Sequence, residues 1–223
     1  FKIFSVAQGL EKDLFTLDSL IDTRAFKINS RKIEDKYKFN SESSIYEIIV
    51  RSSNVGSARL ALMVGEKGLK EIFSKLGLLE PVRLELREAN TTRPILPKNW
   101  HDITLATVSY GYGMSVSLLH LAKAYAILGN GGLNIEPTIL KKNHNSQSGS
   151  RVLKKTTSDE MLKLLEAVVT DQRGTARILR SKYYRIGGKT GTAEKISLEK
   201  KGYQKDKVVA NFVGLFPLQE PRF

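Results

Sequence analysis

The clearest apolar pattern along this chain has helical spacing and lies between residues 157 and 169. Apolar residues recur there every three or four positions, at Met161, Leu164, Leu165, Val168 and Val169. Thr157 and Glu160 are three residues apart and predict a capping box at the start of this helix. A second helical pattern has an apolar face made of Leu118, Leu121, Ala122, Tyr125 and Leu128. The glycines after it predict a left-handed stop.

Two shorter helices are predicted nearer the amino end. Ser44 and Glu47 form a capping-box pattern, and isoleucines at 45, 48 and 49 supply one apolar face. Residues 52–54 follow directly, so we expect them in a tight junction between this helix and the next. Residues 1–7 also have helical spacing, with Lys2 surrounded by apolar side chains.

The carboxyl-terminal part changes to extended runs at 183–194 and 208–216, joined by a lysine-rich segment. We expect these runs to pair as antiparallel strands. The second run is apolar on both faces, which is typical of a strand covered by helices. Residues 83–102 contain prolines and Trp100 without periodicity. They could line a substrate groove, but we expect this loop to cover the helical part of the protein.

Composition narrows the function classes. The chain has 223 residues, enough for one sizeable core, and lacks the run of roughly 18 apolar residues that a membrane helix needs. Its net charge of +13 could serve nucleic-acid binding, but the basic clusters at 141–142, 151–155 and 195–207 are dispersed, so no nucleic-acid partner is predicted. Cysteine is absent, and His101, His120 and His144 are scattered, which predicts no metal site.

Candidate chemistry lies first in the segment 187–194, where Lys189, Thr190 and Thr192 stand on a predicted strand between glycines. Such a strand can present a cation, hydroxyls and backbone amides to an anion. A phosphate-binding P-loop would need glycine at position 183, where the chain has Tyr183. A surface hairpin with a solvated lysine is the alternative interpretation.

Two further candidates have ordinary structural explanations when taken alone. Ser52 or Ser53 could simply cap the following helix. Lys2 could extend its amine to solvent, although burial would lower its pKa toward a value at which it can accept a proton.

Taken together, Lys2, then Ser52-Ser53-Asn54, then Lys189-Thr190-Gly191 resemble the penicillin-binding protein transpeptidases, whose motifs Ser-x-x-Lys, Ser-x-Asn and Lys-Thr-Gly occur in that order. The stretches 111–117 and 174–176 extend the likeness over nearly the whole chain. The second motif is similar to that of the class B members that serve cell division, often called penicillin-binding protein 3.

The resemblance implies an α+β fold of the β-lactamase and transpeptidase type, with an antiparallel sheet flanked by helices and a mostly helical lobe. It implies a single domain over 1–223, with 1–15 and about 171–223 in the helix-and-sheet lobe and about 16–170 in the helical lobe. The family nucleophile is a serine three residues before the lysine, whereas this chain begins one residue before Lys2. We therefore expect both ends to be truncated and this fragment to be inactive in acyl transfer.

The resemblance also implies roles for the site residues. Lys2 is the base, and Ser52 relays a proton between Lys2 and Lys189. Asn54 holds the substrate backbone. Thr190, Gly191 and Thr192 belong to the substrate-binding strand, where the two threonines bind the terminal carboxylate together with Lys189. In the reactive state Lys2 is expected to be neutral, while Lys189 stays charged.

The implied reaction is D,D-transpeptidation of peptidoglycan stem peptides through a serine acyl-enzyme, without a cofactor, and β-lactams would acylate the same serine. The implied place is the outer face of the cytoplasmic membrane, with an amino-terminal anchor and wall-synthesis or division proteins as partners. The basic surface would face anionic wall polymer or lipid headgroups. A D-Ala-D-Ala carboxypeptidase, a β-lactamase and a non-catalytic β-lactam sensor remain alternatives, and Ser53 in the middle of the second motif disfavours the β-lactamase.

Overall fold

The structure is a computed structural model that describes residues 1–141, 149–196 and 203–223. Its helices are α1 (Lys2–Glu11), α2 (Ile45–Val50), α3 (Asn54–Lys75), α4 (Arg87–Thr91), α5 (Asp102–Ser109), α6 (Leu118–Gly129), α7 (Lys155–Thr170) and a 3-10 turn, η2 (Arg177–Leu179). Its strands are β1 (Leu20–Asp22), β2 (Phe26–Ile28), β3 (Arg31–Ile33), β4 (Glu42–Ser44), β5 (Gly187–Ile196) and β6 (Tyr203–Leu215). No helix in these described ranges combines the length and hydropathy needed to cross a membrane.

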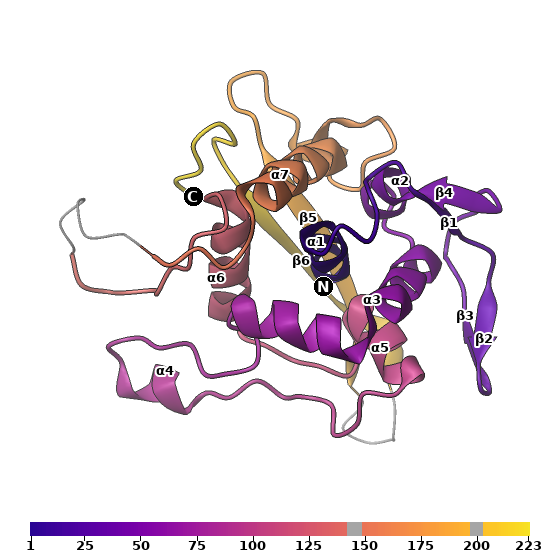
Figure 1. The fold of residues 1–223 in the computed structure, drawn as a ribbon, viewed down its shortest axis with the longest axis horizontal. Coiled ribbons are helices and arrows are strands. Elements are labelled where there is room, and N and C mark those ends of the chain that lie inside the picture. The colour runs from indigo at the N-terminus through magenta and orange to yellow at the C-terminus, as the bar shows by residue number, and fades with distance from the viewer. Residues whose placement is uncertain (142–148, 197–202) are drawn as a thin grey trace.

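Helix α1 lies at the centre of the molecule, between α7 and α3 (Figure 1). All of its residues from Ile3 to Leu10 are buried, and the Phe4 ring packs edge-on against Phe73 of α3 and Tyr125 of α6. The same core includes Ile48 of α2 and Leu165 of α7. One core therefore joins segments from both predicted lobes, and the division into lobes stays a prediction.

The strands form three antiparallel pairs, β1 with β4, β2 with β3, and β5 with β6. In the longest pair, Lys189 lies opposite Val213 and Gly191 opposite Asn211. The predicted strand pairing at the carboxyl end is confirmed, although β5 begins at Gly187 rather than at 183. Helix α7 packs on β5 and α6 on β6.

The expectation that 208–216 is covered on both faces is wrong for the described residues. Val208, Val209 and Phe212 keep 50%, 48% and 38% of their surface exposed. All three side chains lie on β6, which pairs only with β5 in the described part of the chain. An apolar sequence indicates what a strand can bury, whereas its neighbours determine what it does bury.

Two helix details also differ from the expectation. Helix α7 begins at Lys155, two residues before Thr157, and no side chain of its own caps it. Glu11 at the end of α1 does so instead, since its carboxylate accepts the Lys154 N–H at 2.9 Å and the Thr157 hydroxyl at 2.8 Å. In α6, Leu118 and Ala122 are exposed, and the buried face runs through Ala124, Tyr125, Ile127 and Leu128.

His120 and the loop 83–102 also have structural roles. His120 is buried, shares a capping box with Ser117 at the start of α6, and contacts the Glu80 carbonyl at 2.9 Å. The loop contains the short helix α4 and packs Trp100 against Phe73. The described residues do not include His144. They also do not include Lys142 and residues 197–202, which are parts of the basic clusters.

Candidate active site

Lys2 lies in the first turn of α1, where the packing of the helix directs its amine toward the junction of α2 and α3. Its Nζ donates to the Ser52 carbonyl at 2.6 Å, to Ser52 Oγ at 3.1 Å and to Asn54 Oδ1 at 2.7 Å. These three acceptors match the three hydrogens of a protonated amine. The alternative in which Lys2 extends to solvent is therefore wrong.

The junction between α2 and α3 assigns different roles to its two serines. Ser53 caps α3, since its hydroxyl accepts the Gly56 N–H at 2.9 Å. Ser52 has a φ of 64°, a left-handed conformation that costs a residue with a Cβ roughly 1–2 kcal/mol. That conformation leaves the Ser52 hydroxyl facing the cleft. Strained residues of this kind are concentrated at functional sites.

Lys189 reaches the same hydroxyl from β5, with Nζ 3.0 Å from Ser52 Oγ and 3.2 Å from the Thr190 carbonyl. Only 4% of its surface is exposed, so the solvated-hairpin alternative is also wrong. The glycines that flank it allow close packing. A Cβ at Gly188 would lie 2.3 Å from the Phe212 ring, and one at Gly191 would lie 2.4 Å from Asn211 Oδ1.

The first turn of α1, the junction of α2 and α3, and strand β5 form the walls of a cleft of about 610 Å³. All seven residues predicted for the site line it: Lys2, Ser52, Asn54, Lys189, Thr190, Gly191 and Thr192. Segments that are 50 and 137 residues apart in the sequence therefore meet at one hydroxyl. No group of three or more potential metal ligands occurs among the residues that the structure describes.

Both lysines have lowered pKa values. Burial lowers the pKa of Lys2 to about 8, while the negative charge of Asp35 opposes this shift. Burial and the charge of Lys2 lower the pKa of Lys189 to about 7. The expectation that Lys2 is neutral and Lys189 charged in the reactive state stays a prediction. Since the two amines repel each other, they titrate as a pair.

Asp35 was not found by sequence reasoning. It lies between β3 and β4, and its carboxylate accepts the Ser53 hydroxyl at 2.6 Å, the Asn54 N–H, and the Val55 N–H at 3.2 Å. It therefore fixes the turn that carries Ser52 and Asn54. No pattern around Asp35 in the sequence indicates this contact.

Two other residues of the cleft belong to stretches that the sequence had marked only as part of the resemblance. The Thr175 hydroxyl accepts from Thr190 Oγ1 at 2.9 Å. The Tyr112 hydroxyl accepts the Glu194 N–H at 3.2 Å, at the far end of β5. Both side chains line the cleft.

The arrangement can bind an anion and move a proton. Two amines with lowered pKa values share one hydroxyl, so a proton can pass between them through Ser52 Oγ. The Thr190 and Thr192 hydroxyls beside Lys189 suit a carboxylate. This combination of fold and cleft is that of the transpeptidase and β-lactamase-like class.

Comparison with solved structures supports that class. The chain is similar to the apo transpeptidase (TP) domain of penicillin-binding protein 3 from Burkholderia pseudomallei, with a TM-score of 0.89 and 33% identity. The match covers 99% of this chain and 66% of that one. A structure described as a peptidoglycan glycosyltransferase from Burkholderia ambifaria has a TM-score of 0.87 and 32% identity, over 99% and 67% of the two chains.

The chain belongs to the penicillin-binding protein transpeptidase domain family, which it matches over residues 1–223. It is 37% identical over 225 aligned residues to the probable peptidoglycan D,D-transpeptidase FtsI of Caulobacter vibrioides, covering 99% of this chain. It is 31% identical to FtsI of Escherichia coli, over 98% of this chain. The chain spans 38% and 36% of the lengths of these two relatives.

Proposed function

We propose that the protein is a peptidoglycan D,D-transpeptidase of the cell-division type, and that this chain forms the cleft in which the acyl group is transferred. The observation that carries the proposal is the Ser52 hydroxyl, which lies 3.1 Å from the amine of Lys2 and 3.0 Å from that of Lys189. The names of its relatives support the choice of reaction.

The nucleophile in this proposal is the family serine three residues before Lys2, a position that precedes Phe1. Residues three apart share a helix face, so this serine would lie beside the Lys2 amine. Neutral Lys2 takes the proton of the serine hydroxyl while the oxygen attacks the carbonyl of the penultimate D-alanine. With a pKa of about 8, roughly a tenth of Lys2 is neutral at pH 7.

Collapse of the tetrahedral adduct breaks the peptide bond and releases D-alanine. The departing nitrogen receives, through Ser52, the proton that Lys2 took from the serine, so that Lys2 is neutral again. The Asn54 amide holds the stem-peptide backbone. Thr190, Thr192 and Lys189 bind the terminal carboxylate, and the negative charge of that carboxylate would raise the pKa of Lys189 and keep it charged. Backbone amides of Thr192 and of the nucleophilic serine stabilise the oxyanion.

An amine of a neighbouring stem peptide then attacks the acyl-enzyme and forms the cross-link. β-Lactams enter as substrate mimics and acylate the same serine. We place this activity on the outer face of the cytoplasmic membrane, with an anchoring segment and division or wall-synthesis proteins as partners. No organic cofactor or metal takes part.

The proposal is tested with a longer form of the protein that includes the serine position. Labelled penicillin, a stem-peptide donor and an acceptor amine are added together, and the adduct and cross-linked product are measured by mass spectrometry. We expect stable labelling and a cross-linked product. Lys2→Ala should lower the acylation rate by roughly 100-fold or more, since general-base catalysis typically contributes 10²–10⁴-fold, while the variant stays folded.

The other outcomes separate the alternatives. Rapid turnover of the penicillin adduct would indicate a β-lactamase, and release of D-alanine without a cross-link would indicate a carboxypeptidase. Labelling without any product would indicate a sensor. An unchanged acylation rate in Lys2→Ala would exclude Lys2 as the base.

A further inference from the structure

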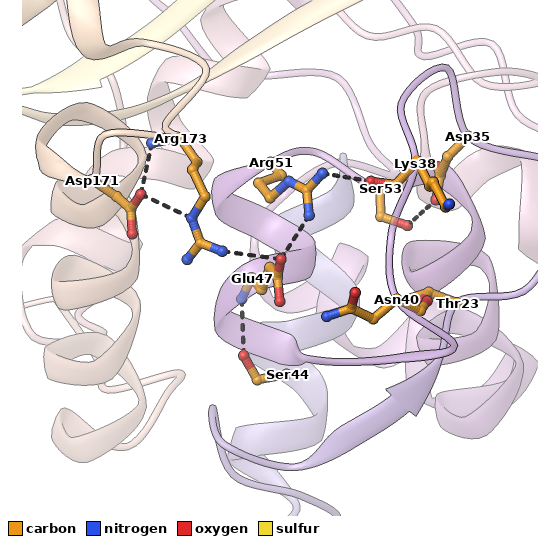
Figure 2. A network of polar contacts seen from close by, with 10 residues as sticks. All are labelled: Thr23, Asp35, Lys38, Asn40, Ser44, Glu47, Arg51, Ser53, Asp171 and Arg173. Carbon is orange, nitrogen blue, oxygen red and sulfur yellow. Dashed lines mark hydrogen bonds and ion pairs between the residues drawn. The ribbon is translucent and has the colours of Figure 1, made fainter.

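A cluster of four charged side chains lies at the edge of the cleft, between α2 and the segment that follows α7, and one of the four, Arg51, lines the cleft. We call Glu47, Arg51, Asp171 and Arg173 the Glu47 network (Figure 2). Glu47 Oε1 accepts from Arg51 Nη1 at 2.7 Å and from Arg173 Nη1 at 3.1 Å. Asp171 Oδ1 accepts the Arg173 N–H at 2.7 Å and lies 3.5 Å from its Nε. One carboxylate oxygen therefore joins two arginines from different parts of the chain.

The network is better protected from solvent than an ordinary surface ion pair. The side chains of Glu47, Asp171 and Arg51 are 15%, 16% and 22% exposed, and that of Arg173 is 54% exposed. Its two positive and two negative charges balance. The Arg173 backbone N–H and its guanidinium both lower the pKa of Asp171. Ion pairs at such depth depend on geometry, and removing one partner leaves a charge without compensation.

Both ends of the network continue into the cleft. Arg51 is the residue directly before Ser52 and also donates to the Lys38 carbonyl at 2.7 Å. Arg173 lies two residues before Thr175, whose N–H donates to the Val50 carbonyl at 3.3 Å. Thr175 in turn accepts the hydrogen bond from Thr190, the neighbour of Lys189. The network therefore spans the joint between the wall that carries Ser52 and the wall that carries Lys189.

We propose that Glu47 and Arg173 are positioning residues that hold the Thr175 and Thr190 wall against the Ser52 turn and thereby keep water away from the amine of Lys189. Neither residue touches the space for a substrate, since neither lines the cleft. The proposal rests on the proposed function only where it assumes that the cleft binds a substrate. The contact between Glu47 and Arg173 is a property of the folded chain and does not depend on that function.

The expected consequence of loosening this joint follows from the burial of Lys189. Desolvation is the first cause of its lowered pKa. If the walls separate, water reaches the amine and the pKa rises toward the ordinary value for lysine. The charged group that acts on Lys189 is Lys2 on α1. Lys2 does not belong to the network.

The test uses the sign of the change. By direct charge effects alone, Arg173→Ala would raise the pKa of Lys189 and Glu47→Gln would lower it, because the two substitutions remove opposite charges. If the residues act by positioning, both substitutions raise it. We measure the pKa of Lys189 by NMR titration of its side-chain carbon beside the amine, assigned with Lys189→Arg. We expect a rise of about one unit in both variants.

Arg185→Ala is a matched control. Arg185 is 54% exposed, like Arg173, and forms a bidentate pair with Glu166 at 2.6 Å, near the other end of the segment that links α7 to β5. It has no contact with α2 in this network, so its loss should leave the pKa of Lys189 unchanged. Arg173→Lys keeps the positive charge and a hydrogen-bond donor. It should therefore raise the pKa of Lys189 less than Arg173→Ala does.

Several results would overturn the proposal. Shifts of opposite sign in the two variants would indicate a direct charge effect only, and an absence of any shift would indicate that the network does not control the cleft. An equal rise in Arg185→Ala would indicate general loosening of the segment. If Arg173→Ala does not fold, Glu47→Gln decides alone, because its two possible effects differ in sign. The readout needs no turnover, so its failure is distinct from failure of the proposed function.

Discussion

The two lysines of the cleft are carried by walls that differ in packing. Lys2 belongs to α1, a helix buried on every side, with Phe4 fully enclosed behind it. Lys189 belongs to β5, whose partner β6 leaves Phe212 38% exposed. Both amines are nevertheless desolvated and share Ser52. The pKa of each amine therefore depends on its immediate contacts. The contribution of each wall to the stability of the protein depends instead on how well the side chains behind the amine are packed.

The largest expected effect separates the two walls by stability. Phe4→Ala should lower the free energy of unfolding by about 3–5 kcal/mol, the usual cost of removing a fully buried aromatic ring. Phe212→Ala should cost only about 1 kcal/mol, since part of that ring is already in water. Urea unfolding of both variants measures the two values. Equal losses would contradict the proposed contrast between the walls.

The next effect concerns the cost of burying Lys189. Its folded pKa of about 7 lies below the ordinary value of 10.5, so the unfolded chain binds more protons between these pH values. Stability should therefore rise with pH through this window. Lys189→Met removes the buried amine and should increase the free energy of unfolding at pH 7 by roughly 4 kcal/mol, a difference that falls to less than about 1 kcal/mol at pH 10.

Lys195→Met provides the control for that experiment, because Lys195 lies on the same strand and is exposed. Its stability should stay within about 0.5 kcal/mol of the parent at both pH values. Urea unfolding at pH 7 and pH 10 compares the three proteins. If Lys189→Met were no more stable than the parent at pH 7, the buried amine would not carry the expected cost.

The smallest effect concerns the carboxylate on the Lys2 side of the cleft. The negative charge of Asp35 raises the pKa of Lys2. Asp35→Asn should therefore lower the pKa of Lys2 by about half a unit. NMR titration of the lysine side chains measures this shift. The pH at which acylation reaches half its maximum should move downward with it.

Glu34→Gln is the matched control for Asp35→Asn. Glu34 is the neighbouring carboxylate, 60% exposed and paired with Lys32 at 2.5 Å, away from the turn that Asp35 holds. Its substitution should leave the pKa values of Lys2 and Lys189 unchanged. A fall in the pKa of Lys2 in both variants would mean that the general charge of the loop, rather than the Asp35 contact, sets the value.

Local patterns were sufficient wherever the determining contacts lie close together in the sequence. Ser44 caps α2, with its hydroxyl accepting the Glu47 N–H at 3.2 Å, and the apolar spacing of 1–7 forms α1. They failed where a distant residue intervenes. The start of α7 is set by Glu11, 143 positions before the Lys154 N–H that it accepts, so the local pattern at Thr157 and Glu160 gave the wrong boundary.

The sequence by itself determined the order and identity of the motif residues, and all seven predicted site residues line one cleft. Only the tertiary structure decided that Asp35 holds the Ser52 turn, that Arg173 reaches Glu47, and that burial lowers the pKa of Lys189. The physical reason is that side-chain type fixes what a group can donate or accept. Its proton affinity depends instead on how much water and how many charges surround it, and these are set by segments far away in the chain.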